Sequence, residues 1–197
     1  KENRNIIAKF NFYKKKFKNF NFNLNLVLDN DIIYVSDNIG YLYALDYKKN
    51  KLLWAKNYKV PFRSNLKISG SKLIAADQMN HLYFFDKNNG NTLKLIPSEE
   101  TIVKNEFINN LALNNNNLFY LNTYGSLYSI NINNLNLNWF QNFNQSLDIN
   151  PSNLFEGNGL VSIDNKLILS TDKNIYILDT STGAILFRKN LSSSINP

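Results

Sequence analysis

The sequence contains no cysteine, one histidine and one methionine, and no apolar run approaches the ~20 residues that a transmembrane helix needs. The absence of cysteine excludes disulfide bonds and thiolate metal sites, but it does not indicate a compartment. The chain shows no starting methionine and no signal peptide, and it begins within a strand-like pattern, RNIIAKFNFY. We therefore expect an excised or processed segment. Its 197 residues are enough for one sizeable domain with its own core.

Asparagine and lysine fill many of the polar positions. The 38 asparagines are a compositional bias and carry little information about site chemistry. A formal net charge of +7 could attract nucleic acid or anionic lipid. The lysines are scattered, however, apart from a cluster at Lys14–Lys18, which we interpret as a solvated face. The surrounding stretch NFYKKKFKNF fits an outer strand better than a surface for stacking nucleic-acid bases, so we predict no nucleic-acid partner.

A short segment recurs four times along the chain. Its copies are LYALD (42–46), LYFFD (82–86), LYSIN (127–131) and IYILD (175–179), with last residues spaced 40, 45 and 48 apart. In each unit, two short apolar runs precede this segment and one follows it, separated by turn-forming residues. No segment shows a sustained helical period. Four strands in a repeat of about 40–48 residues indicate the blades of a β-propeller.

The recurring strand is apolar on both sides. In YLYALD, Leu42 and Ala44 face one side, and Tyr43 and Leu45 face the other. An antiparallel sheet with one solvated face would alternate apolar with polar residues. These strands therefore need a neighbouring sheet on each side, as blades around an axis provide. The fourth strand of each unit is more polar, as expected of an outer strand.

The turn after the recurring strand has its own pattern. Asp46, Asp86 and Asp179 begin it, and Asn50, Gly90 or Gly183 follows four positions later. Asp accepts backbone N–H bonds across a turn, and Gly or Asn tolerates the left-handed conformation that closes it. These residues are predicted to make turns. The third unit has Asn131 and Leu135 instead, so we expect an irregular turn that uses Asn133 and Asn134.

A large aromatic residue follows eight positions after the start of most of these turns. Trp54, Trp139 and Phe187 hold this position, and Lys94 holds it in the second unit. Such a ring can cover the edge between adjacent blades and contributes about 2–3 kcal/mol through burial. In the second unit, where Lys94 holds this position, we expect Leu93 or Leu95 to cover the edge between blades in place of the missing ring. Because the aspartate and the aromatic residue recur in most units, we interpret them as architecture rather than catalysis.

The spacing of the repeats gives the predicted organisation. The fold class is all-β, a propeller segment of about four four-stranded antiparallel blades. The predicted boundaries are an outer strand of a preceding blade at 1–19, blades at 20–60, 61–97, 98–145 and 146–191, and the start of a next blade at 192–197. Open blade faces at either end would be sticky, so self-association through them is expected unless further sequence covers them.

Two segments carry a resemblance to a known repeat. YVSDNIGYLYALDYKKNKLLWAKN and LILSTDKNIYILDTSTGAILFRKN resemble the PQQ-like β-propeller repeat, in which LYALD precedes a TG turn and a Trp-bearing strand. The resemblance covers about residues 20–191 and is weaker in the second and third units. Within this superfamily the chain is most similar to the outer-membrane protein assembly lipoprotein BamB family.

This resemblance implies a function. It implies an eight-bladed ring without cofactor, of which this chain is about half. It also implies a non-enzymatic scaffold in the bacterial periplasm that binds the central barrel-assembly protein at the outer membrane. The alternative within the superfamily is a quinoprotein dehydrogenase that uses pyrroloquinoline quinone and calcium. Those enzymes carry an adjacent-cysteine disulfide, which this chain lacks, and no set of calcium ligands can be placed. A WD-repeat scaffold would need Trp-Asp and Gly-His dipeptides, which are also absent.

The other candidate sites are weak. His81 has no second His or Cys to share a metal, so we interpret it as a solvated loop residue. Glu99 and Glu100 are neighbours on a loop, unlike the opposed carboxylates of a glycosidase. The sequence DND at 29–31 lacks the glycine and closing glutamate of a calcium loop. Ser36 and Ser170 have no evident base.

The connections between blades are the best candidates for a binding surface, because loops at the ends of a propeller carry function. They are the ranges 60–65, 97–110 and 144–159, which vary in length while the strands keep their register. Phe62 and Arg63 lie in the first of them and are of the types favoured as interface anchors. They are the predicted partner-binding residues, and their replacement is expected to spare folding.

Overall fold

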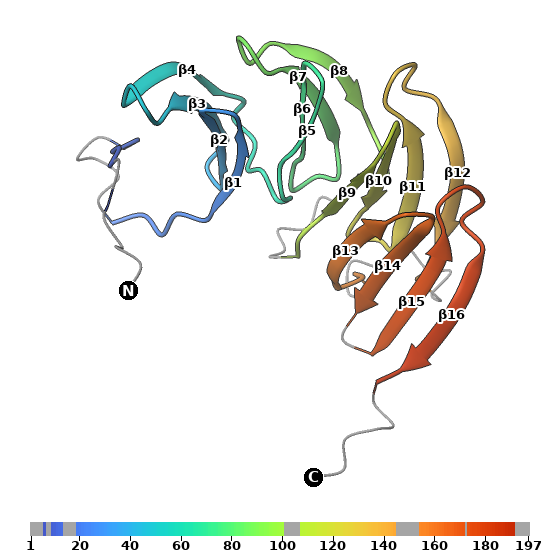
Figure 1. Cartoon of the computed structure of the whole chain (residues 1–197). Helices are drawn as coiled ribbons and strands as arrows, with labels where there is room; N and C mark the ends of the chain where they lie inside the picture. The colour runs from blue at the N-terminus through green and yellow to red at the C-terminus, as the bar shows by residue number, and fades with distance from the viewer. Residues whose placement is uncertain are drawn as a thin grey trace, which may run out of the picture.

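The fold is all-β and is built from four similar sheets. This computed structural model describes residues 6, 9–13, 19–100, 107–144, 154–171 and 173–191, and within these ranges there is no helix. Each sheet has four strands in sequential order, and every neighbouring pair is antiparallel (Figure 1). The predicted fold class, a propeller segment of four-stranded antiparallel blades, is confirmed.

The strands of the four sheets follow the four repeats. Sheet 1 consists of β1 (Leu24–Asp29), β2 (Ile32–Asp37), β3 (Tyr41–Asp46) and β4 (Lys51–Asn57). Sheet 2 consists of β5 (Lys67–Ser69), β6 (Lys72–Ala76), β7 (Leu82–Asp86) and β8 (Thr92–Ile96). Sheet 3 consists of β9 (Asn110–Asn114), β10 (Asn117–Leu121), β11 (Ser126–Asn131) and β12 (Leu137–Asn142). Sheet 4 consists of β13 (Gly157–Ile163), β14 (Lys166–Thr171), β15 (Asn174–Asp179) and β16 (Ile185–Asn190).

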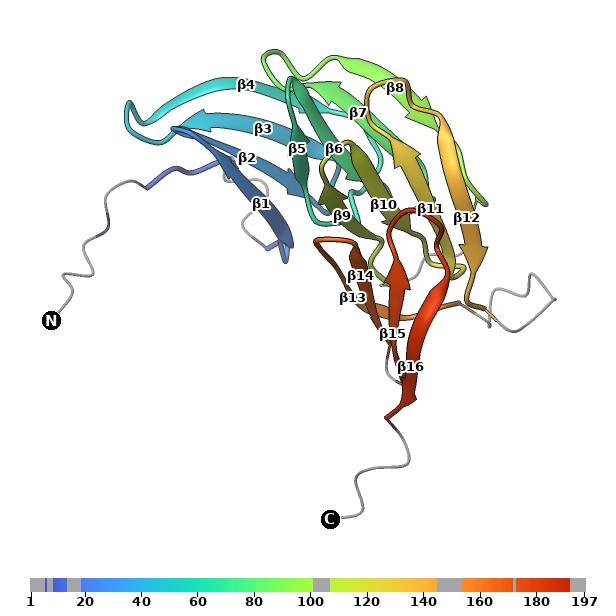
Figure 2. The ribbon, with the colours of Figure 1, turned by 45° about the vertical axis from the view of Figure 1, so that its right-hand side comes forward.

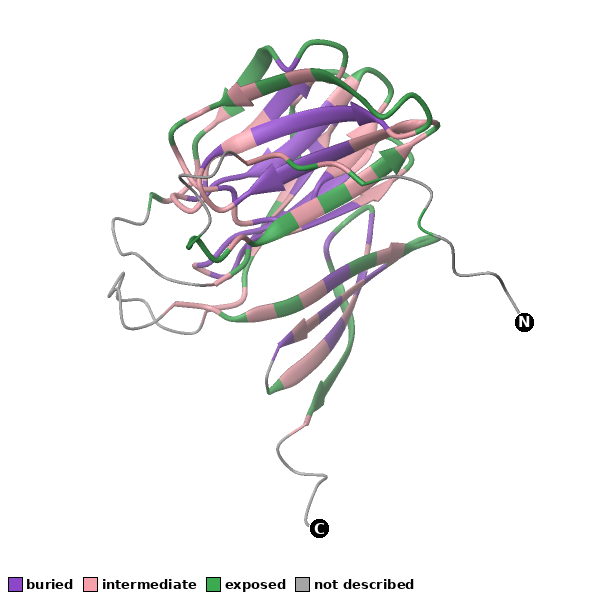
Figure 3. Cartoon of the chain, turned by 90° about the vertical axis from the view of Figure 1, so that its left-hand side faces the viewer, coloured by how far each residue is buried: buried purple, intermediate pink, exposed green. Residues whose placement is uncertain are grey.

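The sheets stand side by side in an open arc. The first strand of each sheet lies on the inside of the arc and the fourth on the outside (Figures 1 and 2). The two middle strands carry most of the buried residues, whereas every residue of β16 is exposed (Figure 3). The polar fourth strands seen in the sequence are therefore the solvent-facing strands.

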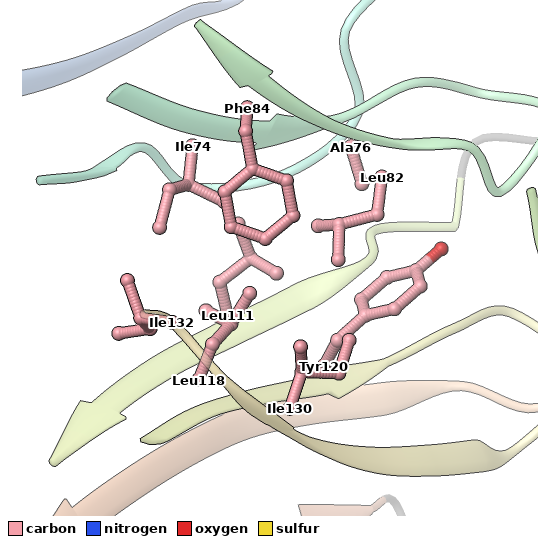
Figure 4. Close-up of a cluster of buried hydrophobic side chains, with 9 residues drawn as sticks. All are labelled: Ile74, Ala76, Leu82, Phe84, Leu111, Leu118, Tyr120, Ile130 and Ile132. Atoms are coloured by element: carbon pink, nitrogen blue, oxygen red, sulfur yellow. The ribbon is translucent and has the colours of Figure 1, made fainter. Parts of the chain in front are cut away.

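Three apolar clusters fill the spaces between neighbouring sheets. Between sheets 2 and 3, Ile74 and Phe84 from one sheet meet Leu118 and Tyr120 from the other (Figure 4). The remaining clusters join sheet 1 to sheet 2 and sheet 3 to sheet 4 in the same way. Sheets 2 and 3 are therefore buried on both faces, which explains why their middle strands do not alternate between apolar and polar residues.

The β3–β4 turn and its equivalents share one geometry. Asp46 Oδ1 accepts the Lys49 N–H at 2.9 Å, and Asp179 Oδ1 accepts the Ser181 N–H at 2.9 Å. Gly90 and Gly183 close their turns with φ of +71° and +74°. The equivalent bonds of Asp86 connect its carboxylate to the Asn88 N–H and its carbonyl to the Gly90 N–H.

The expectation of an irregular third turn is wrong. The Leu135 N–H donates to the Asn131 carbonyl at 2.8 Å, as Gly90 and Gly183 do in their turns, and Leu135 adopts a φ of +60°. Asn131 Oδ1 accepts the Asn133 N–H at 2.9 Å, as the aspartates do elsewhere. A leucine in this region is strained, so the four-residue geometry is retained against local preference.

Each tryptophan of a fourth strand packs on the turn of the next sheet. Trp54 Nε1 donates to the Lys87 carbonyl, and Trp139 Nε1 to the Thr180 carbonyl, both at 3.0 Å. The rings lie on Gly90 and Gly183, where an added Cβ would come within 2.7 Å of a ring atom. Glycine is therefore required at each of these turns for two reasons: the backbone has a positive φ, and the ring above leaves no room for a Cβ atom.

The contact between the fourth strand and the next turn is built differently in the second unit. Lys94 replaces the tryptophan, and Leu135 stands where the following glycine would be. Leu93 and Leu95, expected to compensate, are exposed, and it is Ile96 and Leu135 that pack against the cluster between sheets 2 and 3. Without a large ring above it, the turn accepts a side chain.

Gly90→Ala should destabilise the chain more than Gly70→Ala. Both glycines have positive φ, but an added Cβ at Gly70 has no atom within 4 Å, whereas at Gly90 it meets Trp54. We expect a loss of about 1 kcal/mol for Gly70→Ala from backbone strain and about 2–4 kcal/mol for Gly90→Ala, because steric overlap is added. Urea unfolding measures both. Equal losses would contradict the packing role of Trp54.

Candidate functional site

The described parts of the inter-sheet connections and of the hairpins between second and third strands meet at one end of the arc, here called the connection end. Backbone hydrogen bonds tie the two kinds of loop together. The Tyr58 N–H donates to the Gly40 carbonyl, and the Phe155 N–H to the Thr123 carbonyl, both at 2.8 Å. The connection end therefore presents the irregular parts of the chain on a rigid base.

An acidic or amide side chain organises the hairpin between the second and third strands in sheets 1 to 3. Asp37 Oδ1 accepts the N–H groups of Ile39 and Tyr41 at 3.0 and 2.7 Å. Asp77 Oδ1 and Asn122 Oδ1 each accept the equivalent pair of N–H groups. In sheet 4 the Thr171 hydroxyl takes this role and accepts the Lys173 and Asn174 N–H groups. Asp172, which the sequence pattern aligned with these residues, lies outside the described residues.

The second carboxylate oxygen of the hairpin aspartates accepts a tyrosine hydroxyl. Tyr13 donates to Asp37 Oδ2 at 2.7 Å, and Tyr83 donates to Asp77 Oδ2 at 3.1 Å. Burial and the neighbouring Asp77 charge raise the pKa of Tyr83, so its proton stays on the phenol. These aspartates are therefore hydrogen-bonded on both oxygens.

In sheet 3 a glutamate from the preceding connection supplies the missing carboxylate. Asn122 has an amide where the other hairpins have a carboxylate, and Glu99 accepts a hydrogen bond from its Nδ2 at 2.7 Å. Glu99 also accepts the hydroxyls of Tyr128 at 2.6 Å and Ser126 at 2.8 Å. Burial alone would raise the pKa of Glu99, but these hydrogen bonds outweigh it and hold the pKa below its usual value.

His81 lies between two carboxylates. Its Nδ1 is 3.0 Å from Asp77 Oδ2 and its Nε2 is 3.0 Å from Glu100 Oε1, and its side chain is 14% exposed. The interpretation of His81 as a solvated loop residue is therefore wrong. Burial alone would lower the pKa of His81, but the hydrogen bonds to Glu100 and Asp77 raise it above the ordinary value.

Together, Glu99 and Glu100 fasten the start of the connection between sheets 2 and 3 to the hairpins of both sheets. One glutamate binds the sheet 3 hairpin and the other binds His81 of the sheet 2 hairpin. Within the described ranges, no group of three His, Cys, Asp or Glu side chains could hold a metal. The oxygens and nitrogens are occupied by one another, so the arrangement acts as a clamp between sheets.

The two predicted partner-binding residues lie in different environments. Phe62 is 1% exposed and packs in the cluster between sheets 1 and 2, which makes it a core residue. Nothing in the sequence indicates this burial, because Phe62 lies in a connection and not in a strand. Its replacement would create a cavity, so the expectation that folding is spared is withdrawn for Phe62.

Arg63 is half-buried at the connection end. Its N–H donates to the Ala76 carbonyl at 3.0 Å, and its carbonyl accepts the Asn109 N–H at 2.7 Å. Its Nε is buried without a hydrogen-bond partner in the part of the chain that the structure describes. A cavity of about 100 Å³ adjoins it, with the exposed side chains of Leu24 and Ile108 in its lining.

A larger cavity, of about 330 Å³, lies at the connection end of sheets 3 and 4. Its aromatic lining consists of Phe107, Phe143, Phe155 and Tyr176, and the Arg188 guanidinium lies 5.4 Å from the centre of the Tyr176 ring. The cluster Lys14–Lys18 lies outside the described residues. Among the described residues, no helix is long and apolar enough to cross a membrane.

Comparisons with known proteins bear on this architecture. The family model for the outer membrane protein assembly factor BamB matches residues 13–93, which contain sheet 1 and most of sheet 2. The crystal structure of BamB from Moraxella catarrhalis superposes with a TM-score of 0.63 at 15% identity, over 84% of this chain and 47% of that one. Residues 13–93 are thus similar to the PQQ-like repeats of this family, and the fold of the chain is that of a BamB-like β-propeller segment. No curated protein sequence matches it significantly.

Two computationally designed proteins share the architecture of this BamB-like segment. Ika8 superposes with a TM-score of 0.68 at 14% identity, over 83% of this chain and 48% of the Ika8 chain. Ika4 superposes with a TM-score of 0.69 at 13% identity, over 89% of this chain and 98% of the Ika4 chain. The chain thus spans about half the length of BamB and Ika8 and nearly all of Ika4. At these identities the likeness is one of fold.

The stability contributed by His81 should fall as the pH rises. Because its folded-state pKa lies above the ordinary value of 6.5, the contribution is complete below that pH and is lost as the pH passes through the folded-state pKa. The difference in melting temperature between the wild type and His81→Asn should therefore be largest at about pH 6 and shrink toward about pH 9.

NMR titration can check the cause directly, because His81 is the single histidine of the sequence. Its pKa should lie above 6.5 in the wild type and fall in Glu100→Gln, which keeps the shape of the side chain and removes its charge. A wild-type value at or below 6.5 would contradict the clamp.

Proposed function

We propose that this BamB-like segment is a non-enzymatic, protein-binding scaffold that assists the assembly of outer-membrane β-barrel proteins. The match of residues 13–93 to the BamB family model carries the proposal. The shared architecture over 84% of the chain supports it. The proposed location is the bacterial periplasm at the outer membrane, with the full-length protein a lipoprotein in an eight-bladed ring. The proposed partner is the barrel-assembly machinery.

Arg63 is the proposed centre of the partner-binding surface. Its backbone is held by hydrogen bonds to Ala76 and Asn109, so its position at the connection end is fixed by sheets 2 and 3. Its Nε is buried, so the donors for a partner's carboxylate are the two terminal Nη groups of the guanidinium, which can bind it in a bidentate manner. Leu24 and Ile108 add apolar contact beside it. The surface therefore suits a polypeptide segment that carries an acidic and an apolar side chain.

The scaffold interpretation rests on how the polar groups are used. The aspartates of the first two hairpins and Glu99 are hydrogen-bonded on more than one side, and His81 is held by two carboxylates. Groups that satisfy one another in this way hold the sheets together and are not themselves free to act as a base toward a substrate. This use of the titratable side chains favours a binding role over the quinoprotein alternative.

Arg63→Ala should weaken binding to the periplasmic part of the central barrel-assembly protein by about tenfold or more, because truncating an arginine at the centre of an interface, a residue type enriched among hot spots, costs ~2 kcal/mol or more. The melting temperature should change by no more than about 2 °C, since Arg63 is held through its backbone. Titration calorimetry with the partner from the same organism measures the affinity.

Arg188→Ala is the matched control, because it removes the same charge from the outer strand of sheet 4, where the guanidinium lies over Tyr176. It should leave the affinity unchanged. Equal losses in both variants would mean that net charge alone drives binding, and wild-type affinity in Arg63→Ala would remove Arg63 from the surface. Absence of binding by the wild type would contradict the proposed function.

Pyrroloquinoline quinone with calcium should leave the melting temperature unchanged to within about 1 °C, because a scaffold has no site that would bind them in the folded state. Differential scanning fluorimetry with and without both additives is sufficient. A rise of several degrees that requires both additives would instead support the quinoprotein alternative.

A further inference from the structure

We propose that two copies of this chain close a ring by packing sheet 1 of each copy on sheet 4 of the other. The inference does not depend on the proposed function, since it concerns only the two ends of the arc. It rests on which faces of the sheets are covered and on the residues that those faces carry.

Neighbouring sheets in the chain always meet through opposite faces. We call the face that packs on the next sheet the following face and the one that packs on the previous sheet the preceding face. In the first contact, Tyr34 and Ala44 on the following face of sheet 1 meet Leu73 and Phe85 on the preceding face of sheet 2. The two other contacts use the equivalent positions. The chain therefore makes the same type of interface three times.

Among the described residues, no sheet lies against the preceding face of sheet 1. Leu28, Ile33, Leu45 and Leu52 form a row across the four strands of this face. Leu26 and Leu28 are each 60% exposed, and they line an apolar groove of about 520 Å³ with Ile33. Such an apolar groove at the end of a stack of sheets is typical of an interaction surface.

Part of this face is already covered by the start of the chain. The centres of the Phe12 and Tyr43 rings lie 4.7 Å apart, and the Tyr13 hydroxyl donates a hydrogen bond to the Asp37 carboxylate. The described residues in 1–19, which were predicted to form an outer strand of a preceding blade, form no strand; residues 192–197, the predicted start of a next blade, lie outside the described residues. The uncovered part of the face is the inner one, along β1.

The following face of sheet 4 is likewise not covered by any sheet in the part of the chain that the structure describes. Val161, Ile168, Ile177 and Phe187 form a row across its four strands. Val161 is exposed and Phe187 is 49% exposed, although the equivalent residues of sheets 1 and 3, Trp54 and Trp139, pack against their neighbours. Each interface inside the chain joins a following face to a preceding face. Sheet 4 has an uncovered following face and sheet 1 an uncovered preceding face, so the two can form the same type of interface.

The residues at the proposed join obey the pairing seen inside the chain. A tryptophan in the fourth strand goes with a glycine in the next turn, as in Trp54 with Gly90. At the join, Phe187 would meet the position of that glycine in sheet 1, which is Asn50 with a φ of +48°. Phenylalanine is smaller than tryptophan and has no ring N–H that needs a hydrogen-bond acceptor in the turn. A turn residue with a side chain can therefore lie beneath it.

A closed pair covers both faces with the same kind of contact. A two-fold arrangement makes two identical joins and leaves no free face, whereas a single join would leave two faces open to further copies. A second copy therefore covers all the exposed apolar rows at once.

The 197-residue chain, of 22.8 kDa, should run as a dimer in sedimentation velocity and light scattering at micromolar concentration. Leu28→Asp and Phe187→Asp should each raise the dissociation constant at least 100-fold, since each places a charge in both joins. Leu137→Asp is the control, because Leu137 is 57% exposed on the outer strand of sheet 3, away from either join. Circular dichroism checks that each variant is folded.

Mixing the two variants identifies which sheets meet. A pair made of one Leu28→Asp copy and one Phe187→Asp copy has one join without a substitution, so the mixture should form dimers that neither variant forms alone. A monomeric wild type, or an open series of larger oligomers, would overturn the proposal. So would a dimer that Phe187→Asp leaves unchanged, because it would indicate that sheet 1 packs on sheet 1. None of these results would bear on binding at Arg63.

Discussion

Each sheet in the interior of the arc has to bury two apolar faces, and it can do so only against other sheets. This requirement sets the order and spacing of the sheets, because a face that is left open costs hydrophobic free energy in proportion to its area. The three apolar clusters between the sheets meet this requirement. The fourth strands lie on the outside of the arc, where they face solvent, and they are accordingly more polar. The turns, the tryptophans and the connections all serve to hold the sheets in register for this contact.

Much of the fold could be predicted from the sequence because its signal is repeated. Four copies of one strand, with Asp and Gly at fixed offsets, indicate the sheets even though the third copy is degenerate. Leu135 was mispredicted because local preference argues against a left-handed leucine, whereas the packing of Ile96 and Leu135 favours the regular turn. Thr171 could not be recognised because the sheet 4 hairpin is shorter than its equivalents, which shifts the alignment by one residue.

The candidate site was harder to predict because its contacts join distant parts of the chain. Glu99 bonds a hairpin more than twenty residues away, and nothing near Glu99 in the sequence indicates this. In hindsight, the asparagine at position 122 was the available signal, since it lacks the charge that Asp37 and Asp77 provide. Phe62 looked like a surface anchor because connections usually lie outside the core, yet this connection crosses an apolar cluster.

The stacking of each tryptophan on a glycine of the next sheet limits how repeats of this kind can be exchanged. A sheet cannot be moved, duplicated or grafted as an independent module, because its fourth strand must suit the turn that follows it. Trp54 and Trp139 require a glycine, whereas Lys94, which is followed by the Leu135 turn, does not. Recombination between propellers would therefore preserve folding best when the crossover falls within a sheet, so that each fourth strand travels with the turn beneath it.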